Sequence, residues 1–366
     1  MTANEFKPDW LSTPGSTIRD VIKAQGISTK QLAKLLGYNL EQTERLLRGK
    51  DVITRDVAKI LSKEIGGAEK FWISREANYR SEVARLQDAG NIAAAKAWLD
   101  ALPIKDMQKL GWLPEHKNTA DTLADTLDFF DVKNVVEWRE KYAPILSAVA
   151  FRTSPTYKSE PGAVLAWLRR GELRSAEVDC RPWNPSSFER ALIHMRRLTR
   201  LKGPLQFVPE LKRLCAQHGV ALVFARPPAG CRASGATRFL TKQKSMILLS
   251  FRYLSDDHFW FTFFHEAGHL VLHNNRSFFI EDGSEVSLKE EHEANLFAQN
   301  ILIPPEARAE FLSLKPNRQS VMKFAVKTGI SRGVVVGQLQ HHGKLRRDQL
   351  NYLKRRYTEE ELKQIN

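Results

Sequence analysis

The spacing of apolar side chains divides the amino-terminal part of the chain into short amphipathic helices. Residues 28–36 carry apolar positions at helical spacing, and Gly37 follows as a helix stop. Asn39 caps a second predicted helix over residues 40–48, and a third covers residues 54–65. Two short helices joined by a three-residue turn that contains glycine predict a helix-turn-helix unit.

The middle of the chain, residues 81–200, predicts further helices. Strong helix formers fill residues 91–99, and apolar positions recur at helical spacing over residues 127–138 and 163–170. The aromatic residues expected in the core of this region are Trp98, Trp112, Phe129, Phe130, Trp138 and Trp167. We predict a helical linker region without chemistry of its own.

The apolar pattern changes in the second half of the chain. Residues 245–253 are rich in β-formers and predict a strand. Ser255, Asp256 and Asp257 then offer caps before a dense apolar run that predicts a helix. Residues 321–345 predict two helices joined by a turn. Because the second of these helices is apolar, we expect the segment to pack on the preceding domain.

Length, charge and cysteine content limit the class of protein. A chain of 366 residues is expected to form two or three domains, and its net charge of +14 favours polyanionic or acidic partners. Its three cysteines have no paired spacing, which argues against a disulfide framework or a cysteine zinc site. No apolar run approaches the roughly twenty residues that span a bilayer, and no signal-peptide core appears. We therefore expect a soluble, cytoplasmic protein with no membrane partner.

The most direct chemical signal is the sequence HEAGH at residues 265–269. In an α-helix, residues i and i+4 lie on one face, about 6 Å apart along the axis, so His265 and His269 can bind one ion. A catalytic zinc needs three protein ligands and an open position for water. Glu266, rotated about 100° from His265, is the predicted general base for that water. The pattern predicts a mononuclear zinc hydrolase, and the alternative is a helix that holds no metal.

The third ligand is expected from the acidic segment that follows. Glu291 and Asn295 stand at i and i+4, so we prefer Glu291 as the ligand and Asn295 as a residue that hydrogen-bonds a ligating imidazole. Glu293 is the alternative ligand. On a straight helix His273 lies about 12 Å along the axis from His265, too far for a bond of about 2.1 Å to the same ion. We therefore assign His273, like Asn295, to the second layer around the metal.

These motifs resemble the ImmA/IrrE family of zinc metallopeptidases, over about residues 205–310. The family pattern is HExxH, then ExxAN-x-FA, then a hydrophobic residue and a proline. After HEAGH, this chain has EHEANLFA at residues 291–298 and Leu302-Ile303-Pro304. The resemblance supports Glu291, because the first glutamate of the second motif is similar to the metal ligand of gluzincin-type proteases. It also implies a zincin-like fold, in which a small antiparallel sheet lies beside the metal-bearing helix and the substrate extends along the sheet edge.

Residues 245–253 are the candidate for that edge. A peptide could add to such a strand through main-chain hydrogen bonds, although the same residues fit a core strand equally well. The candidates to stabilise an oxyanion are Tyr253, His258 and His273.

The amino-terminal helices resemble the Cro/C1-type (XRE) DNA-binding domain, and more narrowly the HigA-type antitoxin, over residues 13–80. The resemblance rests on Arg48-Gly49-Lys50, Ile53-Thr54-Arg55 and Phe71-Trp72. It implies DNA contacts to base edges or phosphates by Gln31, Leu40, Glu41, Gln42, Arg45, Arg48 and Lys50. Leu40, Glu41 and Arg45 would face base edges, whereas Gln31, Arg48 and Lys50 would meet phosphates. The alternative is a module that docks protein.

Together the patterns predict an α+β protein, mostly α. The expected segments are a helix-turn-helix domain (1–80), a helical linker region (81–200), a zinc metallopeptidase domain (201–310) and a carboxy-terminal helical extension (311–366). A helix-turn-helix protein commonly reads paired half-sites, which is compatible with a homodimer.

The resemblances imply a transcriptional regulator that binds double-stranded operator DNA and carries a Zn²⁺-dependent endopeptidase. It would cleave a protein partner or itself and so control a stress, toxin–antitoxin or phage-defence operon. The alternative is a HigA-like antitoxin or repressor whose zinc domain senses or scaffolds, or binds a toxin, without proteolysis.

Overall fold

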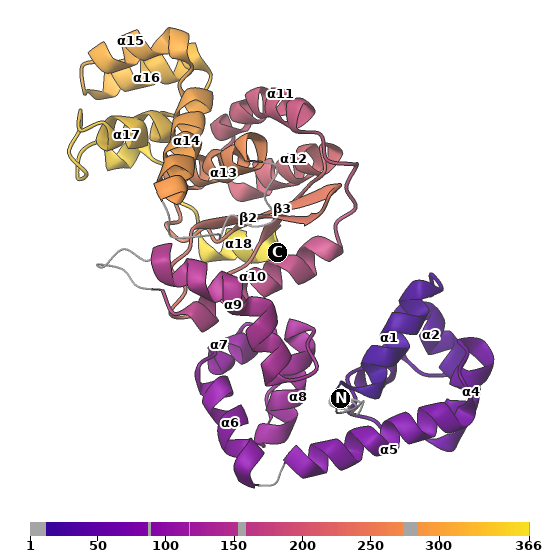
Figure 1. Cartoon of the computed structure of the whole chain (residues 1–366). Helices are drawn as coiled ribbons and strands as arrows, with labels where there is room; N and C mark the ends of the chain where they lie inside the picture. Colours follow the sequence, from indigo (N-terminus) through magenta and orange to yellow (C-terminus); the bar gives the residue numbers. More distant parts are fainter. Residues whose placement is uncertain (1–11, 87–88, 117, 153–158, 274–284, 366) are drawn as a thin grey trace. The chain divides into compact units, whose positions relative to one another are not determined.

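The computed structural model describes residues 12–86, 89–116, 118–152, 159–273 and 285–365 (Figure 1). The chain forms two compact units, residues 1–143 and 144–366. Each unit is described by itself. Within the described ranges, no helix combines the length and the apolar character needed to cross a membrane.

The first unit begins with five helices around a small apolar core. These are α1 (Pro14–Ala24), α2 (Thr29–Leu36), α3 (Leu40–Leu47), α4 (Arg55–Glu64) and α5 (Glu69–Leu86). Ser28 and Asn39 cap α2 and α3, and Gly37 ends α2 with a left-handed φ of 68°. The predicted starts and stops of these two helices are therefore confirmed. Their buried faces, with those of α1 and α4, enclose Ile18, Leu32, Leu46 and Val57.

Four more helices follow, the last of which crosses the boundary between the units. They are α6 (Ala89–Asp100), α7 (Ile104–Lys109), α8 (Thr119–Phe130) and α9 (Val135–Arg152). Trp98, Phe130, Trp138 and Tyr142 pack edge to face or tilted, with ring centroids 5.4 to 6.4 Å apart. Trp98, Phe130 and Trp138, which were predicted to lie in the core, are buried.

The second unit is built around a three-stranded sheet. Its strands are β1 (Val220–Phe224), β2 (Gly235–Thr241) and β3 (Lys244–Leu249), in the order β1-β3-β2. β2 and β3 pair antiparallel, whereas β1 and β3 pair parallel. The predicted antiparallel sheet is therefore wrong in part, because the sheet is mixed.

The strand predicted over residues 245–253 is central, not an edge. It ends at Leu249, and Phe251 beyond it has a φ of 53° that no strand can continue. The physical reason lies in its sequence: the run Met246–Leu249 is apolar at every position, and all four residues are buried. A strand covered on both faces shows such a run, whereas a half-exposed edge alternates. The edges that remain for a peptide are β1 and β2.

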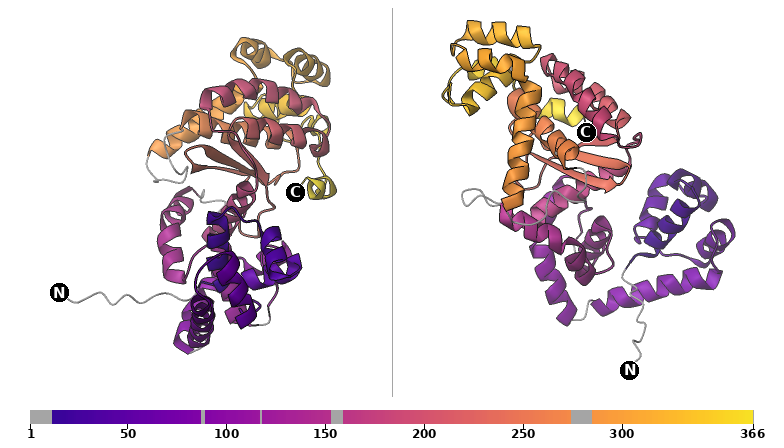
Figure 2. Two further views of the ribbon diagram at one scale, coloured as in Figure 1. Left: turned by 90° about the vertical axis from the view of Figure 1, so that its right-hand side faces the viewer. Right: turned by 45° about the horizontal axis from the view of Figure 1, so that its top comes forward.

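Helices cover both faces of the sheet (Figures 1 and 2). Ile247 and Leu249 point to a core shared with α12 (Pro204–Gln217) and α13 (Asp256–Leu272). Leu248 and Met246 point the other way, against Gly171 of α10 (Pro161–Ala176). The other helices are α11 (Pro185–Met195), α14 (Glu285–Leu302), α15 (Pro305–Ser313), α16 (Arg318–Thr328), α17 (Arg332–His341) and α18 (Glu359–Gln364), with 3₁₀ turns at Arg196–Arg200 and Asn351–Leu353.

The carboxy-terminal helices belong to the same core as the sheet. α17 packs on α13, as expected for the apolar second helix of residues 321–345. Gly333 and Gly337 permit this close approach. A Cβ at Gly333 would lie 2.1 Å from an Asp256 oxygen, and a Cβ at Gly337 would lie 2.7 Å from the Asp257 Cβ. Asp256 and Asp257 form the first turn of α13, so α17 is fitted directly onto the start of the helix that carries the HEAGH motif.

Candidate functional site

Helix α13 positions the two histidines of the HEAGH motif. Its first turn is acidic, which suits the positive end of the helix dipole. Gly268 faces α14, where an added Cβ would lie 3.0 Å from the Phe297 Cδ1 and 3.3 Å from the Ala294 Cα. A glycine that is unfavourable in a helix by about 1 kcal/mol is therefore explained by a close helix–helix contact. This contact brings the acidic segment of α14 next to the histidines.

The two histidines and Glu291 of α14 converge on one point. The Nε2 atoms of His265 and His269 lie 3.1 Å apart. The Glu291 oxygens lie 3.3 Å from the His265 Nε2 and 3.4 Å from the His269 Nε2. A tetrahedral ion with bonds of about 2.1 Å needs ligand atoms separated by about 3.4 Å. The three side chains therefore fit a zinc-sized ion, and they form the one group of this kind among the residues that the structure describes.

Asn295 fixes the orientation of one ligand. Its Oδ1 lies 3.1 Å from the His265 Nδ1, so an amide oxygen at this position accepts the Nδ1 hydrogen. The Nε2 lone pair of His265 then faces the other ligand atoms, as a metal requires. The structure thus brings Asn295 to the position that the sequence predicted for it.

The carboxylates of Glu291 and Glu266 create a negative field at the two histidines. Burial disfavours the ionised form of Glu291, but hydrogen bonds with His265 and His269 hold the pKa of that carboxyl well below its usual range. Burial likewise opposes protonation of His265, yet the hydrogen bond with Glu291 and the charge of Glu266 raise the pKa of that imidazole. A negative field of this kind also attracts a divalent cation.

Glu266, the predicted base, is buried beside the beginning of β2. A Cβ at Gly235 would lie 2.6 Å from the Glu266 Oε1 and 2.7 Å from the Cγ2 of Thr262, one turn earlier on α13. The backbone of Gly235 therefore forms the wall against which the carboxylate lies. Gly235 was not among the site residues predicted from the sequence, although a glycine at the start of a strand can mark a close backbone approach.

His273 and Glu293 lie apart from the three ligand candidates and bind each other. The His273 Nε2 is 2.9 Å from a Glu293 oxygen, and the His273 ring centroid lies 5.5 Å from that of His269. The structure thus brings Glu291, the preferred residue, to the histidines and brings Glu293 to His273.

Two of the oxyanion candidates stack on each other two turns before His265. The rings of Tyr253 and His258 lie 4.2 Å apart at 27°. Burial lowers the pKa of His258, which favours the neutral imidazole.

All seven residues proposed for DNA contact are exposed on α2, α3 or the turn after α3. Two of them complete helix caps: Gln31 and Gln42 accept the backbone N–H of Ser28 at 2.8 Å and of Asn39 at 3.0 Å.

Both arginines of the set are paired within the unit. The Arg45 guanidinium donates to Asp51 with an Nη2–Oδ1 distance of 2.8 Å, and the Arg48 Nε lies 3.6 Å from a Glu44 oxygen. Asp51 was not among the residues predicted from the sequence. Lys50, Glu41 and the exposed side chain of Leu40 complete the set.

Comparison with known proteins bears on the second unit. No curated protein and no solved structure matches the chain. A family model does match within it, over a range that contains β1 to β3, the HEAGH motif and Glu291. Residues 215–340 match the model of Peptidase M78, the IrrE N-terminal-like domain.

Proposed function

We propose that the chain is a transcriptional regulator whose second unit is a zinc-dependent endopeptidase. The observation that carries the proposal is the convergence of His265, His269 and Glu291 within a distance that one ion can span, with Glu266 on the same helix. The match of residues 215–340 to a peptidase family model supports it. The substrate is a protein partner, such as a repressor or an antitoxin, or the chain itself.

The residues of the site divide the chemistry among them. When bound, Zn²⁺ supplies a Lewis acid that polarises the scissile carbonyl and lowers the pKa of water. Glu266 accepts the proton of the attacking water and returns it to the amine that leaves. Asn295 holds the His265 ring in the tautomer whose Nε2 can ligate. An extended substrate would pair with β2, the edge strand whose first residue touches Glu266.

Metal binding and peptide cleavage can be tested separately. We expect about one zinc per chain by mass spectrometry in the wild type and in Glu266→Gln, and little in His269→Ala. His341→Ala is a matched control, because His341 lies on α17 outside the ligand group. Incubated with the proteins encoded beside its gene, zinc-loaded wild type should release fragments, and Glu266→Gln should cut roughly 10²- to 10⁴-fold more slowly. Equal cutting by both would assign the products to a contaminant, and no cutting by either would defeat the peptidase proposal.

The amino-terminal helices supply the proposed DNA-binding function. Its support is the pair of capped short helices α2 and α3 and the exposure of all seven candidate residues. Binding to the promoter region of the chain's own gene should weaken steeply with salt, because phosphate contacts release counterions. Arg45→Ala combined with Lys50→Ala should abolish the mobility shift, whereas Lys315→Ala combined with Lys323→Ala, two exposed lysines of the second unit, should leave it unchanged. Absence of any shift with the wild type would favour a protein-docking module, and a shift that survives the first pair would place the DNA contacts outside these two residues.

Together these activities would couple cleavage of a protein to the expression of a stress, toxin–antitoxin or phage-defence operon. The coupling is expected in one direction: a regulator bound at an operator removes the partner that holds the operon silent. A reporter driven by that promoter should therefore stay silent with Glu266→Gln under conditions in which the wild type induces it.

A further inference from the structure

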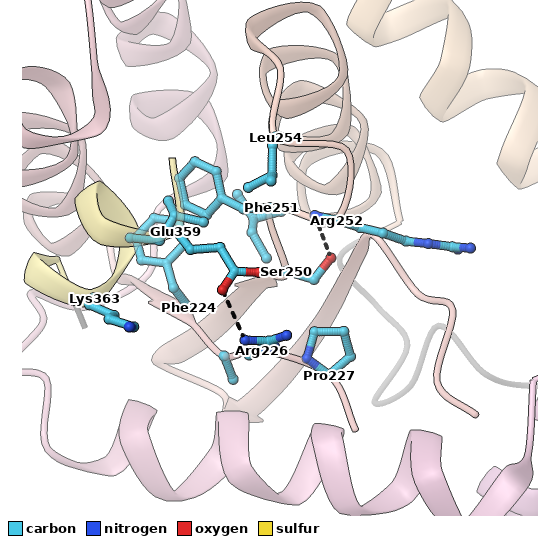
Figure 3. A pocket seen from close by; sticks show the side chains of 12 residues that line it. Phe224, Arg226, Pro227, Ser250, Phe251, Arg252, Leu254, Glu359 and Lys363 are labelled. Carbon is cyan, nitrogen blue, oxygen red and sulfur yellow. Dashed lines mark hydrogen bonds and ion pairs between the residues drawn. The ribbon is translucent and has the colours of Figure 1, made fainter. Parts of the chain in front are cut away.

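A cavity of about 260 Å³ opens where β1 and β3 end (Figure 3). Because these strands are parallel, their carboxyl ends lie at the same edge of the sheet, which is where open sheets commonly bind ligands. The described lining comes from the last residues of the two strands, from the segments that follow them and from α18. None of the candidate metal ligands lines it, so the cavity is separate from the site proposed for peptide cleavage.

The interior of the cavity is apolar. Its wall contains Phe224, Leu249, Phe251, Leu254 and Leu362. Phe251 and Leu254 hold left-handed backbone angles, φ 53° and 49°, which bulky residues rarely adopt. Strained residues of this kind tend to occur where a wall is shaped for a ligand.

The mouth of the cavity is cationic. Among the described lining residues, Arg226, Arg252 and Lys363 are cationic and Glu359 is the one acid; the Arg252 guanidinium points away from Glu359 and donates to the Arg232 carbonyl, which leaves Arg226 and Lys363 at the mouth (Figure 3). The Arg226 Nη1 lies 3.3 Å from a Glu359 oxygen, and both side chains are largely exposed (Figure 3). A pair so exposed contributes at most about 1 kcal/mol, so a competing anion can displace Glu359.

A further cation, Lys212, lies against the ring of Phe224, one of the lining residues. The Lys212 Nζ lies 5.3 Å from the centre of the Phe224 ring and donates to the Ile365 carbonyl at 2.9 Å. Burial lowers the pKa of Lys212, and the neighbouring charge of Arg174 lowers it further.

We propose that this cavity binds a small organic acid, with its apolar body against the phenylalanines and its carboxylate on Arg226 in place of Glu359. An arginine can hold a carboxylate through two parallel hydrogen bonds. At about 30 Å³ for each water-sized group, the volume accommodates on the order of ten non-hydrogen atoms. The site goes beyond the proposed peptidase and DNA-binding functions and would make the second unit a receptor for a metabolite of this class.

Calorimetry on the zinc-loaded full-length chain tests the proposal with octanoate and 4-phenylbutyrate as probes. We expect one site per chain for at least one acid, and binding at least about tenfold weaker for 1-octanol, which keeps the apolar body and lacks the charge. No heat with either acid at millimolar concentration overturns the proposal. Equal binding of octanol and octanoate also overturns it, because the cavity would then select only for apolar surface.

Substitutions at the mouth of the cavity should change the affinity for octanoate in opposite directions. Arg226→Gln combined with Lys363→Gln should weaken octanoate about tenfold or more, whereas Glu359→Gln should strengthen it, because the competing carboxylate is gone. The matched control is Arg318→Gln combined with Lys323→Gln, which removes the same charges from exposed positions on α16. Equal weakening by the control would show that net charge alone attracts the acid and would contradict the site.

Discussion

Gly235 is the residue on which the position of the candidate base depends most closely. Any side chain there would collide with the Glu266 carboxylate, since even a Cβ lies 2.6 Å from its Oε1. Gly235→Ala should therefore keep zinc but slow cleavage about 10²-fold, the usual effect of moving a catalytic group by about 1 Å. Ser234→Ala, one residue earlier, is the control and should retain the wild-type rate. Full activity in Gly235→Ala would mean that Glu266 does not act from the position described.

The ion pair between Lys354 and Asp257 is the next residue-scale feature that can be tested. The Nζ–Oδ2 distance is 2.7 Å, and each side chain is only 7% exposed. Lys354→Ala would leave a buried carboxylate without its cation and should lower the free energy of unfolding by about 3 to 5 kcal/mol in urea titrations. Lys327→Ala, which breaks the exposed pair with Glu310, should lower it by at most about 1 kcal/mol. Similar losses from both substitutions would contradict the argument.

Asp256 makes stability depend on pH. Burial, together with the charge of the neighbouring Asp257, raises the pKa of this carboxyl to about 6. Hydrogen bonds from Ser331 and the Arg355 backbone oppose this shift. A folded-state pKa above the unfolded value of about 3.9 means that the folded protein binds more protons. Stability from this group is therefore fully present below about pH 4 and is lost as the pH rises through about 6.

Asp256→Asn isolates this dependence. The amide preserves the shape and can still accept the two backbone N–H groups, but it does not titrate. Between pH 4 and 7, the wild type should lose about 3 kcal/mol more unfolding free energy than Asp256→Asn. Parallel curves for the two proteins would show that Asp256 titrates normally.

At the scale of secondary structure, the sequence predicted helices better than the sheet. Local signals define a helix: Ser28, Asn39 and Gly37 set the limits of α2 and α3, and the one-turn spacing of His265 and His269 placed two nitrogens on one side of α13. Sheet order depends on pairing partners far away in the sequence. The residue types from Ser245 onward predicted a strand. Its central position in the sheet could not be inferred without knowing that β1 pairs with it.

The contact between α13 and α14 determines whether Glu291 reaches the histidines. Gly268→Leu would push the side chain into Phe297 and force the two helices apart. We expect zinc affinity, measured by chelator competition, to fall about tenfold or more. Leu272→Ala, at an exposed position of the same helix, should leave the affinity unchanged. An unchanged affinity in Gly268→Leu would mean that α14 can move without carrying Glu291 away.

At the scale of the whole molecule, zinc should stabilise one unit and not the other. A ligand present at a thousand times its Kd stabilises the unit that binds it by about 4 kcal/mol. Hydrogen exchange should therefore quicken in α13 and β3 after zinc is removed, while α2 to α4 of the first unit keep their rates. Faster exchange in both units would show that they unfold together.

The whole-chain organisation was the hardest to predict. The four segments expected from the sequence remain predictions, and contacts divide the chain more coarsely, into two units. Packing explains the difficulty: one core runs from Phe188 to Ile365 and so joins parts of three of those segments. Apolar periodicity shows that a helix has a buried face but does not show which partner covers it.

The start of α13 has a consequence for how the protein is made. Its first residue, Asp256, accepts the backbone N–H of Arg355, and Ser255 bridges to Arg356, so the helix is completed by chain synthesised almost a hundred residues later. While the ribosome is still translating the intervening helices, Asp256 and Asp257 lack the partners that permit their burial. The HEAGH helix should therefore pack late onto the rest of the second unit. A nascent chain halted before residue 354 would contain both histidines, but the start of their helix would not yet be fixed in place. Such timing would keep the proposed peptidase inactive until synthesis of the chain is complete.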